Sequence, residues 1–90
     1  MEFEADPVKA AQNLKKHKVS FEEAASVFGD PMAYTFRDPD HSVGEHRWLT
    51  FGMSRVGRVL GVIYTERRGK LRLISARTAT KQERSIYEEA

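Results

Sequence analysis

Apolar residues in the first third of the chain recur every three or four positions, which predicts helices. Asp6 followed by Pro7 is typical of a helix start, because the aspartate side chain accepts a free backbone N–H and proline fits the first helical position. The basic run at residues 15–18 complements the negative end of the helix dipole and predicts where this helix ends. Its expected core-facing residues are Val8, Ala11 and Leu14.

A second helix is predicted after a short link. Ser20 and Glu23 have the spacing of a capping box, in which each side chain accepts a backbone N–H from the other residue. Residues 29–31, Gly-Asp-Pro, stop this helix. Two helices joined by so short a link predict an antiparallel or crossed hairpin. Before them, residues 2–5 predict a short edge strand.

From residue 32 onward the apolar period changes to two, which predicts strands. The predicted strands cover residues 32–36, 47–53, 58–65 and 71–77. Turn residues separate them at 37–42, 54–57 and 67–70, and Gly69 suits a backbone with positive φ. The strand at 58–65 is the most apolar of the four, so we expect it at the centre of the sheet.

A second capping box, Thr80 with Glu83, predicts a final helix over residues 81–89. The element order is therefore β-α-α-β-β-β-β-α. This order predicts one α+β domain over residues 1–90, with an N-terminal strand and helical hairpin, a four-stranded antiparallel meander and a C-terminal helix.

The composition is that of an ordinary globular protein, with 40% apolar and 31% charged residues among 90. The absence of cysteine excludes disulfides and thiolate chemistry, and it fits a reducing compartment. No apolar run approaches the roughly 20 residues of a membrane span. The acidic first four residues lack the apolar core of a signal peptide, so we expect a cytoplasmic protein without a membrane partner.

Charge is distributed unevenly along the chain. Residues 1–46 carry five Lys/Arg against nine Asp/Glu, a net charge of −4. Residues 47–90 carry ten Lys/Arg against four Asp/Glu, a net charge of +6, spread through strand-like and helix-like sequence. The second half is either a solvated basic face or a surface that binds phosphate, and charge alone leaves both interpretations open.

The sequence lacks the motifs of metal and nucleotide sites. It has no His-x-x-x-His pair, no carboxylates at metal-ligand spacing and no glycine-rich phosphate loop. We therefore expect neither a metal nor a cofactor.

Arg77 is the most informative candidate residue. Strict alternation sets it on the face of Leu71, Leu73 and Ser75, where a guanidinium loses part of its hydration and needs an anion. That anion is a carboxylate, for which Glu83 is the obvious competitor, or a phosphate from a ligand.

The order and spacing of several segments resemble the BrnT family over nearly the whole chain. These segments are residues 13–24 (NLKKHKVSFEEA), 28–31 (FGDP), 38–42 (DPDHS), 45–47 (EHR), 74–77 (ISAR) and 80–87 (TKQERSIY). The resemblance implies a RelE-like ribonuclease toxin of a type II toxin–antitoxin system that cleaves RNA and blocks translation. It also implies a BrnA-type antitoxin from the adjacent gene, a complex with two copies of each chain, and repression of the operon through DNA bound by the antitoxin.

Metal-free RNA cleavage needs a cation at the phosphate and groups that move protons. Arg77 and Arg47 are the candidates for the phosphate, because arginine binds phosphate with two parallel hydrogen bonds. The proton-transfer candidates are Glu66, His17 and Tyr87; His41 and His46 are weaker ones in a polar loop. The candidates for further RNA contacts are Arg67, Arg68, Arg72 and Lys16. The alternative to a metal-independent endoribonuclease is a basic module that binds RNA or protein without cutting.

Two residues depart from the pattern of the BrnT family. Ala5 stands where members commonly have tryptophan, which removes an aromatic side chain from the first strand. Lys18 stands where members commonly have glycine after the first helix. A non-glycine residue with positive φ there is destabilising by about 1 kcal/mol.

Overall fold

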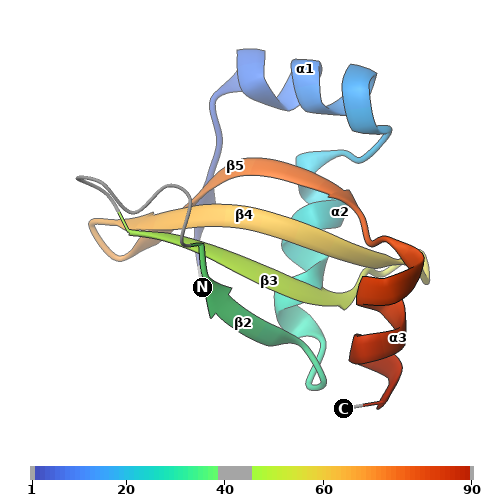
Figure 1. Ribbon diagram of the computed structural model, residues 1–90. Coiled ribbons are helices and arrows are strands. Elements are labelled where there is room, and N and C mark those ends of the chain that lie inside the picture. The colour runs from blue at the N-terminus through green and yellow to red at the C-terminus, as the bar shows by residue number, and fades with distance from the viewer. Residues whose placement is uncertain (1, 39–45, 90) are drawn as a thin grey trace.

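The computed structural model describes residues 2–38 and 46–89. The chain folds as a mixed α+β domain with one five-stranded sheet and three α-helices in this part (Figure 1). The elements are β1 (Phe3–Glu4), α1 (Pro7–His17), α2 (Phe21–Ser26), the 3-10 turn η1 (Val27–Gly29), β2 (Tyr34–Arg37), β3 (Arg47–Met53), β4 (Val59–Arg67), β5 (Lys70–Thr78) and α3 (Lys81–Glu89). The predicted element order is confirmed, although residues 39–42 of the predicted turn lie outside the described residues.

The strands lie in the order β1-β5-β4-β3-β2. Strands β2 to β5 pair with their chain neighbours in antiparallel fashion, whereas β1 pairs in parallel with β5. The apolar strand β4 is central, as its composition predicts. The tight turn between β4 and β5 places Arg68 and Gly69 at φ 54° and 78°, the two consecutive positive values of a hairpin turn that matches strand twist.

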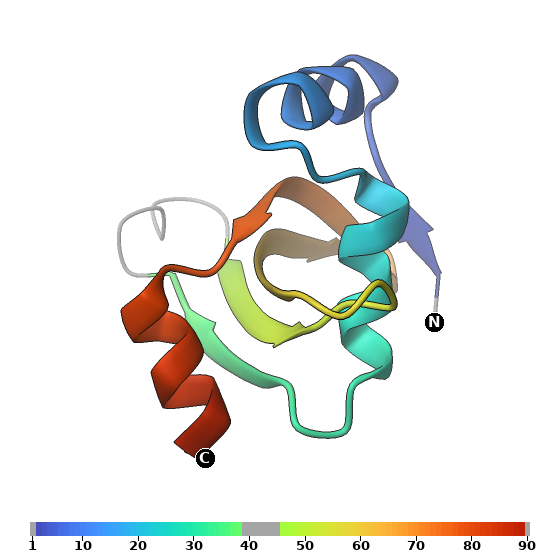
Figure 2. The ribbon, with the colours of Figure 1, turned by 90° about the vertical axis from the view of Figure 1, so that its right-hand side faces the viewer.

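Helix α2 and η1 cover one face of the sheet, and α3 lies on the opposite side (Figure 2). The covered face holds the core, which includes these fully buried or nearly buried residues: Val19, Phe21, Ala24, Val27, Leu60, Val62, Tyr64, Leu71, Leu73 and Ala76. We call the opposite side of the sheet the open face. Of the helices in residues 2–38 and 46–89, only α3 packs on this side of strands β2 to β5, at one end.

The predicted buried face of α1 is wrong. Val8 and Leu14 are 63% and 51% exposed, and the buried residue of this helix is Asn13, at 6%. The Asn13 side chain donates to the carbonyls of Val19 and Ala76 and accepts the N–H of Ala76, all at 2.9–3.0 Å. At Ala76 the backbone groups of β5 thus bond to an amide side chain rather than to another strand, so α1 turns its polar side to the sheet edge.

The predicted orientation of Arg77 is also wrong, because β5 contains a β-bulge. Tyr64 of β4 pairs with Leu73 while Ile63 pairs with Ser75, so Ile74 is the extra residue. Beyond the bulge the alternation is inverted, and Ala76 points into the core with Leu71 and Leu73. Ser75 and Arg77 consequently face the open side of the sheet.

The helix starts follow the predicted N-caps, but only half of the capping box predicted for Ser20 and Glu23 is confirmed, because the Glu23 carboxylate binds Arg58 and Ser54 instead of the Ser20 N–H. The side chains of Asp6 and Ser20 accept the N–H groups of Val8 and Glu23, at 2.9 and 3.0 Å. Lys18 adopts the left-handed conformation expected at its position, with φ 59° and ψ 32°.

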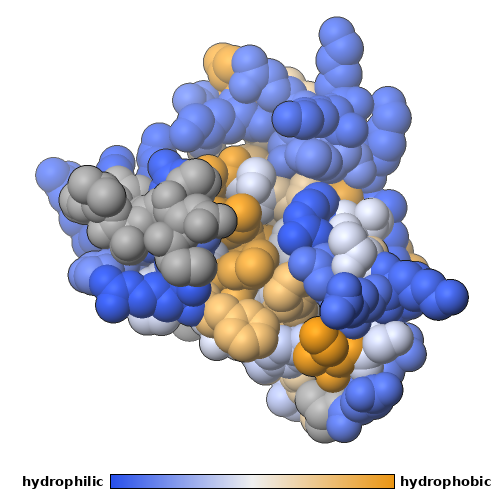
Figure 3. Space-filling model, viewed as in Figure 1, coloured by the Kyte–Doolittle hydropathy of each residue, from blue (hydrophilic) through white to orange (hydrophobic). Residues whose placement is uncertain are grey.

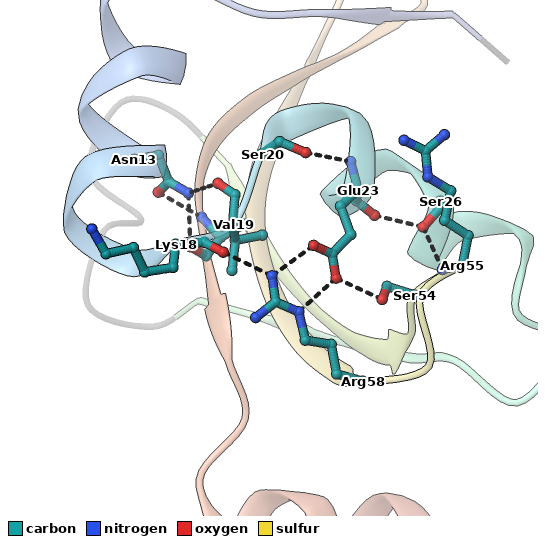
Figure 4. Close-up of polar contacts among 10 residues, drawn as sticks. Asn13, Lys18, Val19, Ser20, Glu23, Ser26, Ser54, Arg55 and Arg58 are labelled. Atoms are coloured by element: carbon teal, nitrogen blue, oxygen red, sulfur yellow. Dashed lines mark hydrogen bonds and ion pairs between the residues drawn. The ribbon is translucent and has the colours of Figure 1, made fainter.

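Glu23 ties the link between α1 and α2 to the hairpin of β3 and β4 (Figure 4). Its carboxylate is only 7% exposed and accepts from Arg58 Nη2 and Nε at 2.6 and 2.8 Å and from the Ser54 hydroxyl at 2.7 Å. Arg58 also donates to the Lys18 carbonyl at 2.7 Å. The hydrogen bonds from Arg58 are the main reason that the pKa of Glu23 lies below its ordinary value. The network fixes the start of α2 against the sheet.

Candidate nucleic-acid interface

The open face carries three cross-strand rows of side chains. The middle row consists of Phe36, Leu49, Ile63 and Ser75, which are consecutive partners across β2, β3, β4 and β5. Phe36 is 50% exposed, and an apolar band crosses this face between charged regions (Figure 3). An exposed aromatic ring such as that of Phe36 can stack on a nucleobase, and the aliphatic side chains beside it extend the apolar surface.

The second row lies at the end of the open face near residues 46 and 47. It consists of Arg47, Thr65, Arg72 and Glu4, again cross-strand partners. Arg47 and Arg72 are two strands apart, about 10 Å at the usual strand spacing. Arg72 contacts Glu4 at 3.3 Å with both side chains about one-third exposed, a weak pair that a phosphate can replace.

The third row, Tyr34, Phe51, Gly61 and Arg77, meets helix α3. The Arg77 guanidinium forms two parallel hydrogen bonds with Glu83, at 2.7 and 2.9 Å. Glu83 also completes the capping box by accepting the Thr80 N–H at 2.9 Å. The hydrogen bond from Arg77 is the largest cause that lowers the pKa of Glu83 to about 2, so this carboxylate is ionised at neutral pH.

The aromatic ring of Phe51 lies next to Arg77. The guanidinium carbon of Arg77 lies 6.0 Å from the centre of the Phe51 ring, within range of a cation–π contact. Gly61 makes this possible, because a Cβ there would lie 2.9 Å from the Phe51 ring. Arg77 is thus held between the Phe51 ring and the Glu83 carboxylate.

Tyr87 anchors α3 to the other end of β2. Its hydroxyl donates to Asp30, which also accepts the N–H of Met53 at 2.7 Å, and its ring stacks on Tyr34 with centroids 6.3 Å apart. The hydrogen bond to Asp30 raises the pKa of Tyr87 to about 12. A phenol so weakly acidic and already committed to a carboxylate is poorly suited to proton transfer near neutral pH.

Lys16 and His17 lie in a shallow groove between α1 and β5. The groove measures about 250 Å³, and its polar lining includes Lys9, Gln12 and Ser75. Ser75 belongs to the middle row as well, so the groove opens beside the open face.

The remaining candidates surround the turn between β4 and β5. Arg67 and Arg68 line a polar depression of about 350 Å³ together with Lys70 and Glu4. Glu66 is exposed, and it follows Thr65 in the strand, so its side chain points away from the open face. The structure therefore does not bring Glu66 together with Arg47 or Arg77.

Among the loop histidines, His46 contacts the Arg37 guanidinium through its Nδ1. His41 lies outside the described residues. The pairing of Asp30 with Tyr87 could not be predicted from the sequence, since 57 residues separate them and no local pattern links them.

Residues 2–38 and 46–89 contain no group of three His, Cys, Asp or Glu side chains that could hold a metal ion. In the same part of the chain, none of the helices has the length and apolar character that crossing a bilayer requires.

Comparison with known proteins identifies the family. Residues 6–83 match the model of a family described as "Ribonuclease toxin, BrnT, of type II toxin-antitoxin system", and the chain belongs to this family. The fold is similar to that of the Brucella abortus ribonuclease toxin BrnT, known from a 1.1 Å crystal structure, with 21% sequence identity and a TM-score of 0.69. The match covers 90% of this chain and 99% of the Brucella chain. A search of curated proteins gave no match.

Proposed function

We propose that this ribonuclease toxin binds RNA across the open face and cleaves it without a metal ion, thereby inhibiting translation. The observation that carries the proposal is the arrangement of the three rows. An exposed apolar band with Phe36 runs between Arg47 and Arg72 on one side and Arg77 on the other. Bases can stack on the band while the arginines bind the phosphates that flank them.

Arg77 is the residue we propose for the scissile phosphate. Its fork geometry is complementary to two phosphate oxygens, and Glu83 already occupies it with two carboxylate oxygens. A phosphate can replace this carboxylate or bind to the donors of Arg77 that Glu83 leaves open. Arg47 and Arg72 would hold a neighbouring phosphate, with Arg67 and Arg68 as peripheral contacts.

For proton transfer, His17 is favoured over Glu66 and Tyr87. The Glu66 side chain points away from the open face, and Tyr87 has a pKa raised to about 12. His17 lines the groove that shares Ser75 with the open face, and an imidazole can serve as a general acid or base. Its half-buried position beside β5 supports a role at the edge of the bound RNA.

A type II toxin has an antitoxin partner, and we propose a BrnA-type protein that covers the open face and α3. Phe36 and Ile86, 50% and 51% exposed, offer apolar contact next to the arginines. An acidic partner segment would be steered by the arginines, which would make association fast and sensitive to salt.

Expression of the chain alone and cleavage by the purified protein test the function together. We expect growth arrest and RNA degradation in cells, relief by co-expression of the adjacent gene, and RNA cleavage in vitro in excess EDTA. Intact RNA at confirmed soluble expression would support the binding module instead. Loss of cleavage in EDTA that one divalent ion restores would contradict the metal-independent mechanism.

A further inference from the structure

Cationic side chains line the groove between α1 and β5. Lys9, Lys16 and His17 line it, and none of the three forms an ion pair with any residue in the described ranges. Helix α1 itself contains no acidic residue. The positive charges of Lys9 and Lys16 along one wall make the groove favourable for a negatively charged ligand.

Helix stability does not explain the position of Lys9. Lys16 and His17 lie in the last turn of α1, where a cation complements the helix dipole. Lys9 lies in the first turn, where a cation is unfavourable for the same reason. Lys9 and Lys16 are seven residues apart, about two helical turns or roughly 10 Å along the same side of the helix. Between them, Gln12 adds an amide donor to the lining.

The groove is continuous with the open face through Ser75. This residue is the β5 member of the middle row and also lines the groove. Its neighbours on the same side of β5 include Arg77, two residues further along the strand. Seen from the open face, α1 borders the sheet along β5, and the side chains above the apolar band are hydrophilic (Figures 1 and 3).

We propose that this groove binds the phosphodiester backbone of the RNA substrate, one step beyond the phosphate held by Arg77. The proposal rests on the proposed function and extends its binding site. Lys9 and Lys16 bind the phosphate oxygens, and Gln12 and the Ser75 hydroxyl donate hydrogen bonds to them. The RNA strand passes His17 on its way from the open face. RNA long enough to reach the groove is therefore held better than RNA that covers the apolar band alone.

The test uses a non-cleavable 2′-O-methyl RNA oligonucleotide and fluorescence anisotropy over a range of salt concentrations. The groove variant is Lys9→Ala with Lys16→Ala. Its charge-matched control is Lys15→Ala with Arg55→Ala, since both residues are exposed and neither lines the groove. All four positions are on the surface, so both variants should keep the melting temperature of the parent.

We expect the groove variant to bind on the order of tenfold more weakly than the control. The slope of log K against log salt concentration is negative, and each phosphate contact that is lost should make it less steep by about 0.7. A groove variant that binds like the control would overturn the groove proposal and leave the proposed function standing. Absence of binding by the parent protein would contradict RNA binding by the open face itself. A groove variant that loses affinity for the antitoxin but not for the oligonucleotide would identify a protein interface, which also overturns the proposal.

Discussion

The carboxylate of Glu83 fills the guanidinium fork of Arg77, with Nη1–Oε1 and Nη2–Oε2 distances of 2.7 and 2.9 Å. The same carboxylate caps α3 through the N–H of Thr80. In the free protein the arginine that we propose for the scissile phosphate is thus neutralised by the helix that follows it. Stability and substrate binding compete for one side chain.

Glu83→Gln should separate the two roles of this pair. The amide can still cap Thr80 but holds Arg77 only weakly, so the melting temperature should fall by a few degrees, about 1 kcal/mol, since the pair is partly exposed. Binding of 2′-O-methyl RNA should become tighter because Arg77 is released. Glu88→Gln, an equal charge change at an exposed site of α3, is the control. Equal affinities in the two variants would show that Glu83 does not compete with phosphate.

Acid should destabilise the protein through the same carboxylate. Its folded-state pKa of about 2 lies below the ordinary 4.5, so its stabilising contribution is complete above about pH 4.5 and is lost as the pH falls toward 2. Glu23 and Asp30, whose pKa values are also lowered, act in the same direction. Melting temperatures measured from pH 6 to pH 2.5 should therefore decline, and less steeply in Glu83→Gln. If the melting temperature fell equally steeply with pH in the parent and in Glu83→Gln, Glu83 would be excluded as a source of the acid destabilisation.

Glu23→Ala should destabilise the fold without changing the side chains of the open face. The substitution leaves the buried Ser54 hydroxyl and the Arg58 guanidinium without their acceptor. Because Arg58 is 38% exposed and regains water, we expect a loss of about 2 kcal/mol in urea unfolding. The exposed neighbour Glu22→Ala should change stability by about 0.5 kcal/mol or less. Similar losses of stability in the two variants would mean that the hydrogen-bond network around Glu23 adds little to the free energy of unfolding.

The sequence predicts those parts of the fold that depend on local chemistry. The caps at Asp6, Ser20 and Thr80 were predictable because each involves residues two or three positions apart. The central position of β4 followed from its apolar composition. The positive φ of Gly69 followed from the turn type.

Tertiary contacts decided the rest of the fold and of the candidate site. The buried side of α1 depends on the backbone of β5, 63 residues away, which accepts Asn13 in place of a strand. The orientation of Arg77 depends on a bulge at Ile74 that no residue pattern announces. The sequence thus offers candidate residues for the site, and these remain a prediction. Their division between the open face, the groove and the β4–β5 turn could not be predicted from local patterns.

The proposed function requires Arg77 to act on RNA, and the rate of RNA cleavage in EDTA measures this role. The comparison is between Arg77→Ala and Arg55→Ala, which remove the same charge, the second from an exposed position beside α2 (Figure 4). Circular dichroism and thermal unfolding first establish that both variants are folded. We predict a loss of roughly a hundredfold or more for Arg77→Ala, the size expected when one preorganised donor to the transition state is removed, and a near-parental rate for Arg55→Ala. A folded Arg77→Ala protein that cleaves RNA as fast as the parent would contradict the proposed role of Arg77 in RNA cleavage.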